Sequence, residues 1–241
     1  MNLKQYAADL FNVTLTDEQV SRFDRYTEEL LAWNSHTNLT AIIEPEAVMV
    51  RHHLDSLSVL KVVPLHKGML VADVGTGAGF PGLPLHIAVE GLSTTLIEAT
   101  GKKANFCTHL TKALDLKRVI ILHARAEDAG QISYQRGKYD LVVARAVARL
   151  PILLEYLLPL AKIGGMCVAM KGITAQQEAE DSAQALKALG GELVKIEPIE
   201  LPNVPELHYL VVVKKIRQTP VMYPRKPGIP SQSPIGGVPN P

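Results

Sequence analysis

The sequence has few of the residues that mark secreted, membrane-bound or zinc-binding proteins. Only two of its 241 residues are cysteine, Cys107 and Cys167, and they lie far apart in apolar surroundings. We interpret them as separate buried thiols of a reducing compartment, because a disulfide framework or a metal site needs more cysteines at closer spacing. The first residues lack the pattern of a signal peptide, and no apolar run reaches the roughly 20 residues of a membrane helix. We therefore expect a cytoplasmic protein with no metal and no membrane partner.

The sequence also lacks an excess of charge of either sign. Lysine and arginine number 25, aspartate and glutamate number 24, and the formal net charge is +1. A global field that attracts nucleic acid or a membrane surface is thus excluded, and any contact with RNA must use local clusters of charge. Hydrophobic residues make up 47% of the chain, which is enough for the core of one α/β domain with a small extension.

Hydrophobic periodicity divides the chain into three parts: a helical extension over 1–66, a central domain over 67–216 and a proline-rich basic tail over 217–241. In the first part, LTDEQVSRFDRYTEELLAWN predicts a helix whose capping box is Thr16 with Gln19, and a second helix is expected to begin at Pro45. The last part combines proline and glycine with basic residues and has no acidic residue. We expect this tail to contain no helix or strand and to be mobile or loosely packed until substrate binds.

Seven apolar segments in the central part predict β-strands, and helical segments separate the first six. The predicted strands are 69–74, 94–97, 119–122, 139–144, 166–170, 193–199 and 209–214. This alternation predicts a mainly parallel sheet with helices on both faces. The last two strands are joined by EPIELPNVPELH, which we interpret as a loop that returns the last strand antiparallel at the sheet edge. Such a Rossmann-like seven-strand α/β sheet resembles the class I S-adenosylmethionine-dependent methyltransferase fold.

The glycine-rich motif DVGTGAGFPG, residues 73–82, follows the first predicted strand. From Gly77 it matches the dinucleotide fingerprint G-x-G-x-x-G, and from Asp73 it matches the acidic glycine turn of S-adenosylmethionine enzymes. Asp73 favours the second reading, because a carboxylate there would repel a pyrophosphate and attract an ammonium or a sulfonium. We therefore predict S-adenosylmethionine as the cofactor, with Gly75 and Gly77 in its cradle.

Further candidates lie where the predicted strands end, since open α/β sheets bind ligands at their carboxyl edge. Glu98 is expected to accept hydrogen bonds from ribose hydroxyls, with Ala99 and Thr100 flanking the adenine. The turn after the third strand comes beside the adenine in this topology, which makes Ala126 and Glu127 candidates, and Arg145 ends the fourth strand.

Two motifs of other methyltransferase classes are missing. The place of the Asn/Asp-Pro-Pro-aromatic turn that serves amino-group methylation is taken by ARAVA, residues 144–148, and neither cysteine is placed to attack a pyrimidine. The acceptor is then expected to have a free lone pair, as guanine N7 does, although this reasoning does not single out guanine. No catalytic side chain is required by such chemistry beyond positioning, for which Arg145 is the candidate.

Several segments in this order resemble the ribosomal RNA small subunit methyltransferase G family, also called the glucose-inhibited division protein B family. They are WNSHTNLTAI, RHHLDSL, DVGTGAGFPGLPL, GKKANF, RAE, ARAVA, KG and YPRKPGIP. The resemblance implies N7-methylation of a guanosine in bacterial small-subunit (16S) rRNA, with S-adenosylmethionine as donor. It implies that Gly75 and Phe80 line the cofactor, that Ala126 and Glu127 contact its adenosine part and that Arg145 closes the site.

The segment RHHLDSL leaves the roles of His52, His53 and Asp55 open between a cap over the N-terminal junction and a substrate contact. His53 stands where the family commonly has an apolar residue. RNA phosphates are expected to meet local cations, for which the candidates are Lys102, Lys103, Arg149, Arg225 and Lys226.

The expected partner is small-subunit rRNA or a subunit assembly intermediate, and the expected state is a monomer. Two other classes of function stay open at this point. They are a non-catalytic nucleotide- or RNA-binding module and an NAD-dependent oxidoreductase.

Overall fold

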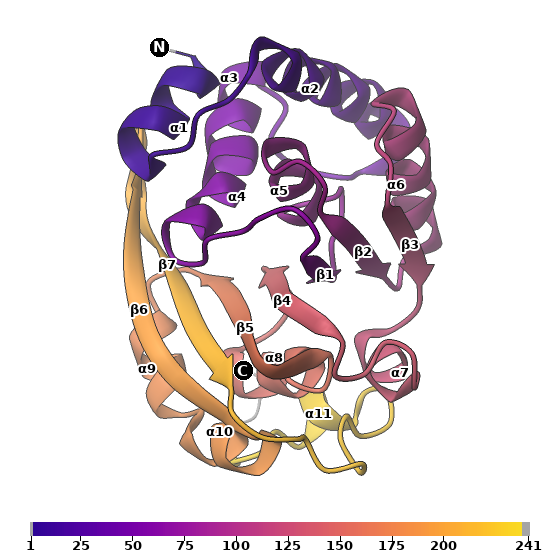
Figure 1. Ribbon diagram of the computed structural model, residues 1–241, viewed down its shortest axis with the longest axis vertical. Helices are drawn as coiled ribbons and strands as arrows, with labels where there is room; N and C mark the ends of the chain where they lie inside the picture. Colours follow the sequence, from indigo (N-terminus) through magenta and orange to yellow (C-terminus); the bar gives the residue numbers. More distant parts are fainter. Residues whose placement is uncertain (1, 238–241) are drawn as a thin grey trace.

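The computed structural model describes residues 2–237, which form a seven-stranded sheet between two layers of helices (Figure 1). The strand order is β3-β2-β1-β4-β5-β7-β6, with β7 antiparallel to both of its neighbours. All seven predicted strands are confirmed. The strands are β1 Leu70–Val74, β2 Ser93–Glu98, β3 Val119–His123, β4 Tyr139–Arg145, β5 Ala161–Lys171, β6 Gly191–Leu201 and β7 Val204–Lys215.

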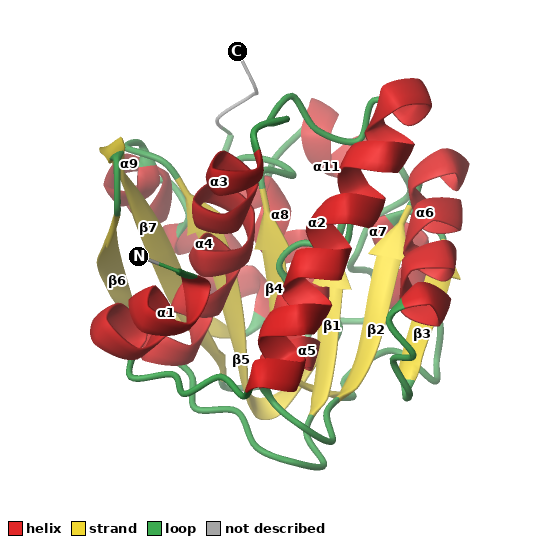
Figure 2. Cartoon of the chain, turned by 90° about the horizontal axis from the view of Figure 1, so that it is seen from above, coloured by secondary structure: helices red, strands yellow, loops and turns green. Residues whose placement is uncertain are grey.

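The helices that precede β3 in the chain cover one face of the sheet, and those that follow it cover the other (Figures 1 and 2). The first group is α1 Leu3–Phe11, α2 Asp17–Thr37, α3 Pro45–Val48, η1 Met49–Leu54, α4 Asp55–Leu57, η2 Ser58–Lys61, α5 Gly82–Ala88 and α6 Gly101–Ala113. The second is α7 Ala126–Gln131, α8 Leu150–Leu157, α9 Ala175–Glu180, α10 Ala183–Leu189 and α11 Ile229–Gln232. None of the helices within residues 2–237 has the length and apolar character needed to cross a bilayer.

The N-terminal helices share one hydrophobic core with the sheet. The predicted capping box begins α2, since the Thr16 hydroxyl accepts from the Gln19 amide at 3.2 Å and the Gln19 side chain accepts from the Thr16 amide at 2.8 Å. Phe23 and Tyr26, one turn apart on α2, are buried in the same cluster as Leu141 of β4. The helical extension therefore completes the sheet on this face.

The second predicted helix does begin at Pro45, but its centre is not an α-helix. Residues Met49–Leu54 form a π-helix, η1, between α3 and α4. A π turn spaces the backbone hydrogen bonds one residue further apart than an α turn and is frequent at functional sites. Within η1, His53 is buried in the core while its neighbour His52 lines a cavity at the sheet edge.

The prediction of a loop in EPIELPNVPELH is wrong, because β6 and β7 run through most of it. Only Pro202 and Asn203 separate the two strands, and Asn203 takes up the turn with a φ of 57°. Pro198 pairs with Tyr209 within the hairpin. β6 is an edge strand, where the missing amide hydrogen of a proline leaves no neighbouring strand unsatisfied.

The prediction of a loosely packed tail without a helix is also wrong for the part that the structure describes, whereas the tail's mobility in the free protein stays a prediction. Residues 217–237 follow a fixed path across α7 and α8 and include the short helix α11, with Thr219, Pro224 and Pro230 buried. The reason is a set of polar partners, spread over three helices and a turn, that no local sequence pattern reveals. Residues 238–241 lie outside the described part of the chain.

Candidate functional site

Two cavities lie side by side at the carboxyl edge of the sheet. The larger cavity has a volume of about 580 Å³ and the smaller cavity about 340 Å³. Both are lined by Gly75 after β1, by Lys103 of α6 and by Ala146 after β4. A ligand that spans both would therefore pass over the glycine loop.

The glycine loop satisfies its own backbone. Six of its amides donate hydrogen bonds inside the protein, to the carbonyls of Ile97 and Thr76 or to the carboxylates of Glu98 and Asp73. These amides belong to Gly75, Thr76, Gly77, Gly79, Phe80 and Gly82. A pyrophosphate needs such amides free at the start of the helix. The loop is thus unsuited to a dinucleotide, which argues against the oxidoreductase reading.

Asp73 lies beneath this loop and lines neither cavity, and its attraction for the cofactor's positive charge stays a prediction. Its carboxylate is fully buried and accepts from the Thr76 hydroxyl at 2.6 Å and the Gly82 amide at 2.8 Å. Burial raises the pKa of Asp73 to about 6, although these two hydrogen bonds act in the opposite direction. A Cβ on Gly82 would lie 2.8 Å from this carboxylate, which explains the glycine there.

All the expected cofactor residues except Thr100 line one of the two cavities within the described chain. Gly75, Gly77, Phe80 and Arg145 line the larger one, and Gly75, Glu98, Ala99, Ala126 and Glu127 line the smaller one. Thr100 supports its neighbour instead, because its amide donates to Glu98 Oε1 at 2.8 Å. The other Glu98 oxygen accepts from the Gly77 amide at 2.9 Å, so the Glu98 side chain is fixed against the loop.

The ring of Phe80 is almost fully enclosed. Tyr26 stacks on it at 4.9 Å between ring centroids, and His52 stacks at 4.6 Å. The Arg145 guanidinium lies 5.1 Å from the same ring. Phe80 is only 4% exposed, so it connects the N-terminal helices to the glycine loop more than it offers a surface to a ligand.

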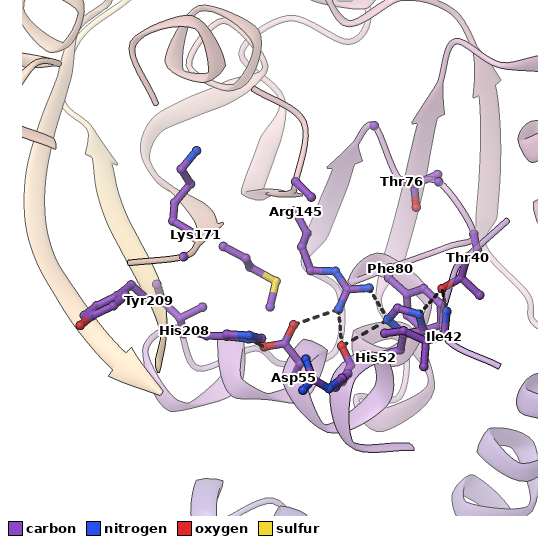
Figure 3. Close-up of a pocket in the computed structure, with 18 of the residues that line it drawn as sticks. Thr40, Ile42, His52, Asp55, Thr76, Phe80, Arg145, Lys171, His208 and Tyr209 are labelled. Atoms are coloured by element: carbon purple, nitrogen blue, oxygen red, sulfur yellow. Dashed lines mark hydrogen bonds and ion pairs between the residues drawn. The ribbon is translucent and has the colours of Figure 1, made fainter. Parts of the chain in front are cut away.

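Arg145 joins the sheet to the N-terminal helical segment in the wall of the larger cavity (Figure 3). One of its terminal nitrogens donates to Asp55 Oδ2 at 2.9 Å and to the Arg51 carbonyl at 3.0 Å, and the other donates to His52 Nδ1 at 3.1 Å. The Asp55 side chain is 3% exposed, so this ion pair is largely shielded from water. Asp55 and His52 thus connect the N-terminal helices to the sheet and also line the cavity, so both roles considered for them stay predictions.

His52 is neutral at physiological pH. Burial and then the positive charge of Arg145 lower the pKa of His52 to about 4. Its Nδ1 lies 3.1 Å from a terminal nitrogen of Arg145 and 3.2 Å from the Arg51 carbonyl, and its Nε2 lies 2.9 Å from the Thr40 hydroxyl.

His53 is also neutral but faces the opposite way. It is 1% exposed, and burial lowers its pKa to about 3. Its Nε2 bonds with the Thr27 hydroxyl at 2.9 Å, while Nδ1 has no hydrogen-bond partner within residues 2–237. His53 is therefore a core residue of the N-terminal helices.

Several lining residues were not predicted. His208 of β7 bonds through Nδ1 with Asp55 Oδ1 at 2.9 Å, and this carboxylate raises the pKa of His208 above its ordinary value. Nothing in the local sequence marks His208, because the contact depends on the pairing of β7 with β5. Further unpredicted lining residues include Thr40, Met170 and Lys171 in the larger cavity and Tyr156, Gly228 and Ser231 in the smaller one.

The five candidate RNA contacts differ in their exposure and in whether they form ion pairs within the protein. Lys103 lines both cavities, and Lys102 and Lys226 are exposed. Arg149 forms an ion pair with Asp181 at 2.9 Å. Arg225 binds the buried Glu155, so the expectation that it offers a free charge to RNA does not agree with the structure.

The pair of cavities suits a ligand made of a nucleoside and an amino acid joined at a central atom. Gly77 has a φ of 61°, lines the larger cavity, and a Cβ there would meet no atom nearer than 3.9 Å, so the absent side chain leaves open space beside the loop. Glu98 and Glu127 lie along the smaller cavity, where ribose hydroxyls or an adenine amine would find acceptors. The residues present therefore fit S-adenosylmethionine.

A sheet of this order, with a glycine loop after β1 and an acidic residue ending β2, defines a class I S-adenosylmethionine-dependent methyltransferase. Solved structures share this fold. An S-adenosylmethionine-dependent O-methyltransferase from Thermotoga maritima matches with a TM-score of 0.55 and 17% identity, over 78% of this chain and 72% of that one. M. jannaschii TYW2, solved in complex with AdoMet, matches with a TM-score of 0.52 and 18% identity, over 64% and 71%.

Sequence relatives narrow this class to one family. The family described as rRNA small subunit methyltransferase G matches residues 19–204. Ribosomal RNA small subunit methyltransferase G of Desulforamulus reducens is 42% identical over 235 residues, 98% of each chain, and that of Alkaliphilus oremlandii is 45% identical over 233 residues, 97% of each. The chain belongs to the rRNA small subunit methyltransferase G family.

Proposed function

We propose that this protein methylates N7 of a guanosine in 16S rRNA, with S-adenosylmethionine as donor. The observation that carries the proposal is the larger cavity, which adjoins the cofactor cradle and contains no uncommitted base among its described side chains. Asp55 is engaged by Arg145 and His208, and both ring nitrogens of His52 have partners in Arg145, the Arg51 carbonyl and Thr40. Guanine N7 needs no deprotonation, so a site that only positions the base is sufficient.

Bound S-adenosylmethionine supplies an electrophilic methyl group on a sulfonium. Along the smaller cavity, Glu98 and Glu127 would hold the adenosine part, and Gly75 and Gly77 would leave room for the cofactor beside the backbone. In the larger cavity, Arg145 is held rigidly by Asp55 and the Arg51 carbonyl. Its fixed guanidinium can orient a base that enters beside it.

The charge of the site also suits this acceptor. N7-methylation moves the positive charge of the sulfonium onto the guanine, and the charge of the Arg145 guanidinium beside it is offset by the carboxylate of Asp55. The lowered pKa of His52, about 4, keeps this side chain neutral next to Arg145. His208, whose pKa is raised by Asp55, becomes an additional cation as the pH falls.

The substrate is proposed to be small-subunit rRNA, free or in an assembly intermediate, bound through phosphates near the cavity mouth. Lys102 and Lys103 begin α6 beside the glycine loop and are the best-placed cations for this purpose. A monomer in the cytoplasm is sufficient for the proposal, since one chain supplies both cavities.

The decisive experiment maps methylated nucleotides in rRNA from cells with and without this protein. One N7-methylguanosine of the small subunit should disappear in its absence and return with the wild-type chain. Calorimetry with S-adenosylhomocysteine and NAD should detect binding of the first ligand alone. An unchanged methylation map together with NAD binding would overturn the proposal.

A further inference from the structure

The C-terminal tail supplies part of the wall of the smaller cavity. Gly228 and Ser231 line it together with Tyr156 of α8, whose hydroxyl lies 3.3 Å from the Ser231 hydroxyl. The chain thus returns, long after the last strand, to the cavity that suits the adenosine part of the cofactor. A residue that fixes the tail in this position also determines the shape of that cavity.

Arg225 fixes the tail to a buried carboxylate. Glu155 lies in the apolar helix α8 with a side chain that is 1% exposed. Arg225 bonds to it through its amide at 2.7 Å, through Nε at 2.9 and 3.2 Å, and through a terminal nitrogen at 2.7 Å. A buried carboxylate without such a partner is strongly unfavourable, so the fold is built to receive this arginine.

The path of the tail before Arg225 is prepared by two other residues. The Arg136 guanidinium donates to the carbonyls of Thr219, Pro220 and Tyr223 at distances between 2.7 and 3.0 Å. A Cβ on Gly130 would lie 2.5 Å from Pro224 Cγ, so the glycine makes room for the proline. These contacts bring the chain to Glu155 in one orientation.

After Arg225 the tail reaches the cofactor cavity within three residues. The Gly228 amide donates to Glu127 Oε1 at 3.0 Å, and Gly228 has a φ of 86° that turns the chain into α11. Glu127 is 5% exposed and lines the same cavity. The orientation of this carboxylate therefore depends on the tail.

We propose that Arg225 is a positioning residue for S-adenosylmethionine. By holding the tail on Glu155, it keeps the Gly228 amide on Glu127 and Ser231 at the wall of the smaller cavity, and so completes the adenosine site. The inference rests on the proposed function, because it requires this cofactor in this cavity. It assigns Arg225 a task different from contact with RNA phosphates.

Calorimetry with S-adenosylhomocysteine on three full-length chains tests the assignment: the wild type, Arg225→Gln and Lys226→Gln. The two variants remove the same charge from adjacent tail residues, but Lys226 is exposed and Arg225 is bound to Glu155. Arg225→Gln should weaken binding by about tenfold or more, which corresponds to a loss of at least ~1.4 kcal/mol. Lys226→Gln should leave the dissociation constant unchanged.

Hydrogen exchange on the wild type gives an independent readout that needs no variant. The amides of Arg225 and Gly228, which donate to Glu155 and Glu127, should exchange more slowly when S-adenosylhomocysteine is bound. A purely structural tail would show lower melting temperatures for Arg225→Gln with unchanged ligand affinity and unchanged exchange.

That purely structural result would overturn the inference. So would an equal loss of RNA affinity in both variants with unchanged ligand affinity. If the wild type itself does not bind S-adenosylhomocysteine, the proposed function fails and the inference fails with it. If the wild type binds and Arg225→Gln binds equally well, only the inference fails.

Discussion

The N-terminal helical segment lines the larger cavity and the C-terminal tail lines the smaller one, but different interactions hold these two segments in place. The N-terminal wall, with His52 and Asp55, rests on the large buried side chains of α2, among them Phe23 and Tyr26. The C-terminal wall rests mainly on directed polar contacts, in which Arg136, Glu155 and Glu127 bind the tail. A cavity wall fixed by apolar burial is part of the hydrophobic core and cannot be deleted without unfolding the domain. A wall fixed by a few polar contacts can be deleted while the rest of the domain still folds. The predictions below test this difference.

The largest effect on ligand affinity is expected at Gly75, which lines both cavities. Gly75 lines both cavities with a φ of 68°, and a Cβ there would lie 2.6 Å from Val147 Cγ2. Gly75→Val should reduce the affinity for S-adenosylhomocysteine by more than about 100-fold, because a β-branched residue both strains this backbone and fills the junction. Gly68→Val is the matched control, since Gly68 has a φ of 92° with open space around it. Similar ligand binding by Gly75→Val and the control, measured by calorimetry, would contradict this placement.

The second effect separates the tail from the rest of the molecule. A chain that ends at Lys215 leaves Glu155 buried without Arg225, and loss of one partner of a buried ion pair costs about 3–5 kcal/mol. We expect a melting temperature lower by roughly 10 °C, on the basis of about 2–4 °C per kcal/mol for a domain of this size. Ligand affinity should fall as well. A chain that ends at Gly237 keeps the described tail and is the control, and equal melting curves of the two chains would refute the polar anchoring.

The sequence predicts the central domain well because each element carries its own signal. The strands are apolar runs of the length that is usual for β-strands, and the capping box of Thr16 and Gln19 marks the start of α2. The tail carries no comparable signal, since its partners lie in α7, α8, α10 and the turn at Arg136, far away in the chain. One clue was available, namely Glu155 within the apolar run of α8, because a buried carboxylate requires a cation somewhere in the fold.

The residues that line the cavities could likewise be predicted only where a pattern within one segment marks them. Strand ends place Glu98 and Arg145 at the correct edge, since parallel strands share their carboxyl ends. The inward turn of Asp73 and the contact between Asp55 and His208 depend on side-chain packing between elements. No pattern within one segment determines such contacts.

The third effect belongs to the N-terminal wall alone. Asp55→Asn removes the negative partner of Arg145 and His208, so the guanidinium beside the base loses its fixed position. Methylation of the subunit should fall by about 10–100-fold, or ~1.4–2.7 kcal/mol. Affinity for S-adenosylhomocysteine should stay nearly constant, in contrast to the tail variants.

Glu206→Gln is the control for Asp55→Asn. Glu206 pairs with Arg51 at 3.6 Å in an exposed position, and such pairs contribute little. If Asp55→Asn weakens the ligand as strongly as it slows methylation, the two walls are not separable as described.

The last effect concerns the acid response of the N-terminal core and is close to zero near pH 7. The pKa of His53 is about 3 in the folded protein because of burial, against 6.5 for an exposed histidine, so the unfolded chain binds the additional proton between these values. Stability from this residue is fully present above pH 6.5 and is lost as the pH falls toward 3, with a slope of up to about 1.4 kcal/mol per pH unit.

His53→Leu should therefore lose less stability than the wild type in urea unfolding between pH 6.5 and pH 4. Near pH 7 the variant should be as stable or slightly more stable, because Nδ1 of His53 has no partner among residues 2–237. Parallel pH profiles for the two proteins would show that His53 is not the acid-sensitive group.

The ion pair between Arg225 and Glu155 also has a consequence for how the chain folds during its synthesis. During synthesis α8 leaves the ribosome well before the tail does, and at that stage its Glu155 has no cation to bind. A carboxylate in that position resists burial, so the apolar helix packs less stably against β4 and β5 until residue 225 has emerged. A nascent chain that stops before residue 225 would therefore hold this face of the sheet less firmly than the chain that contains the tail.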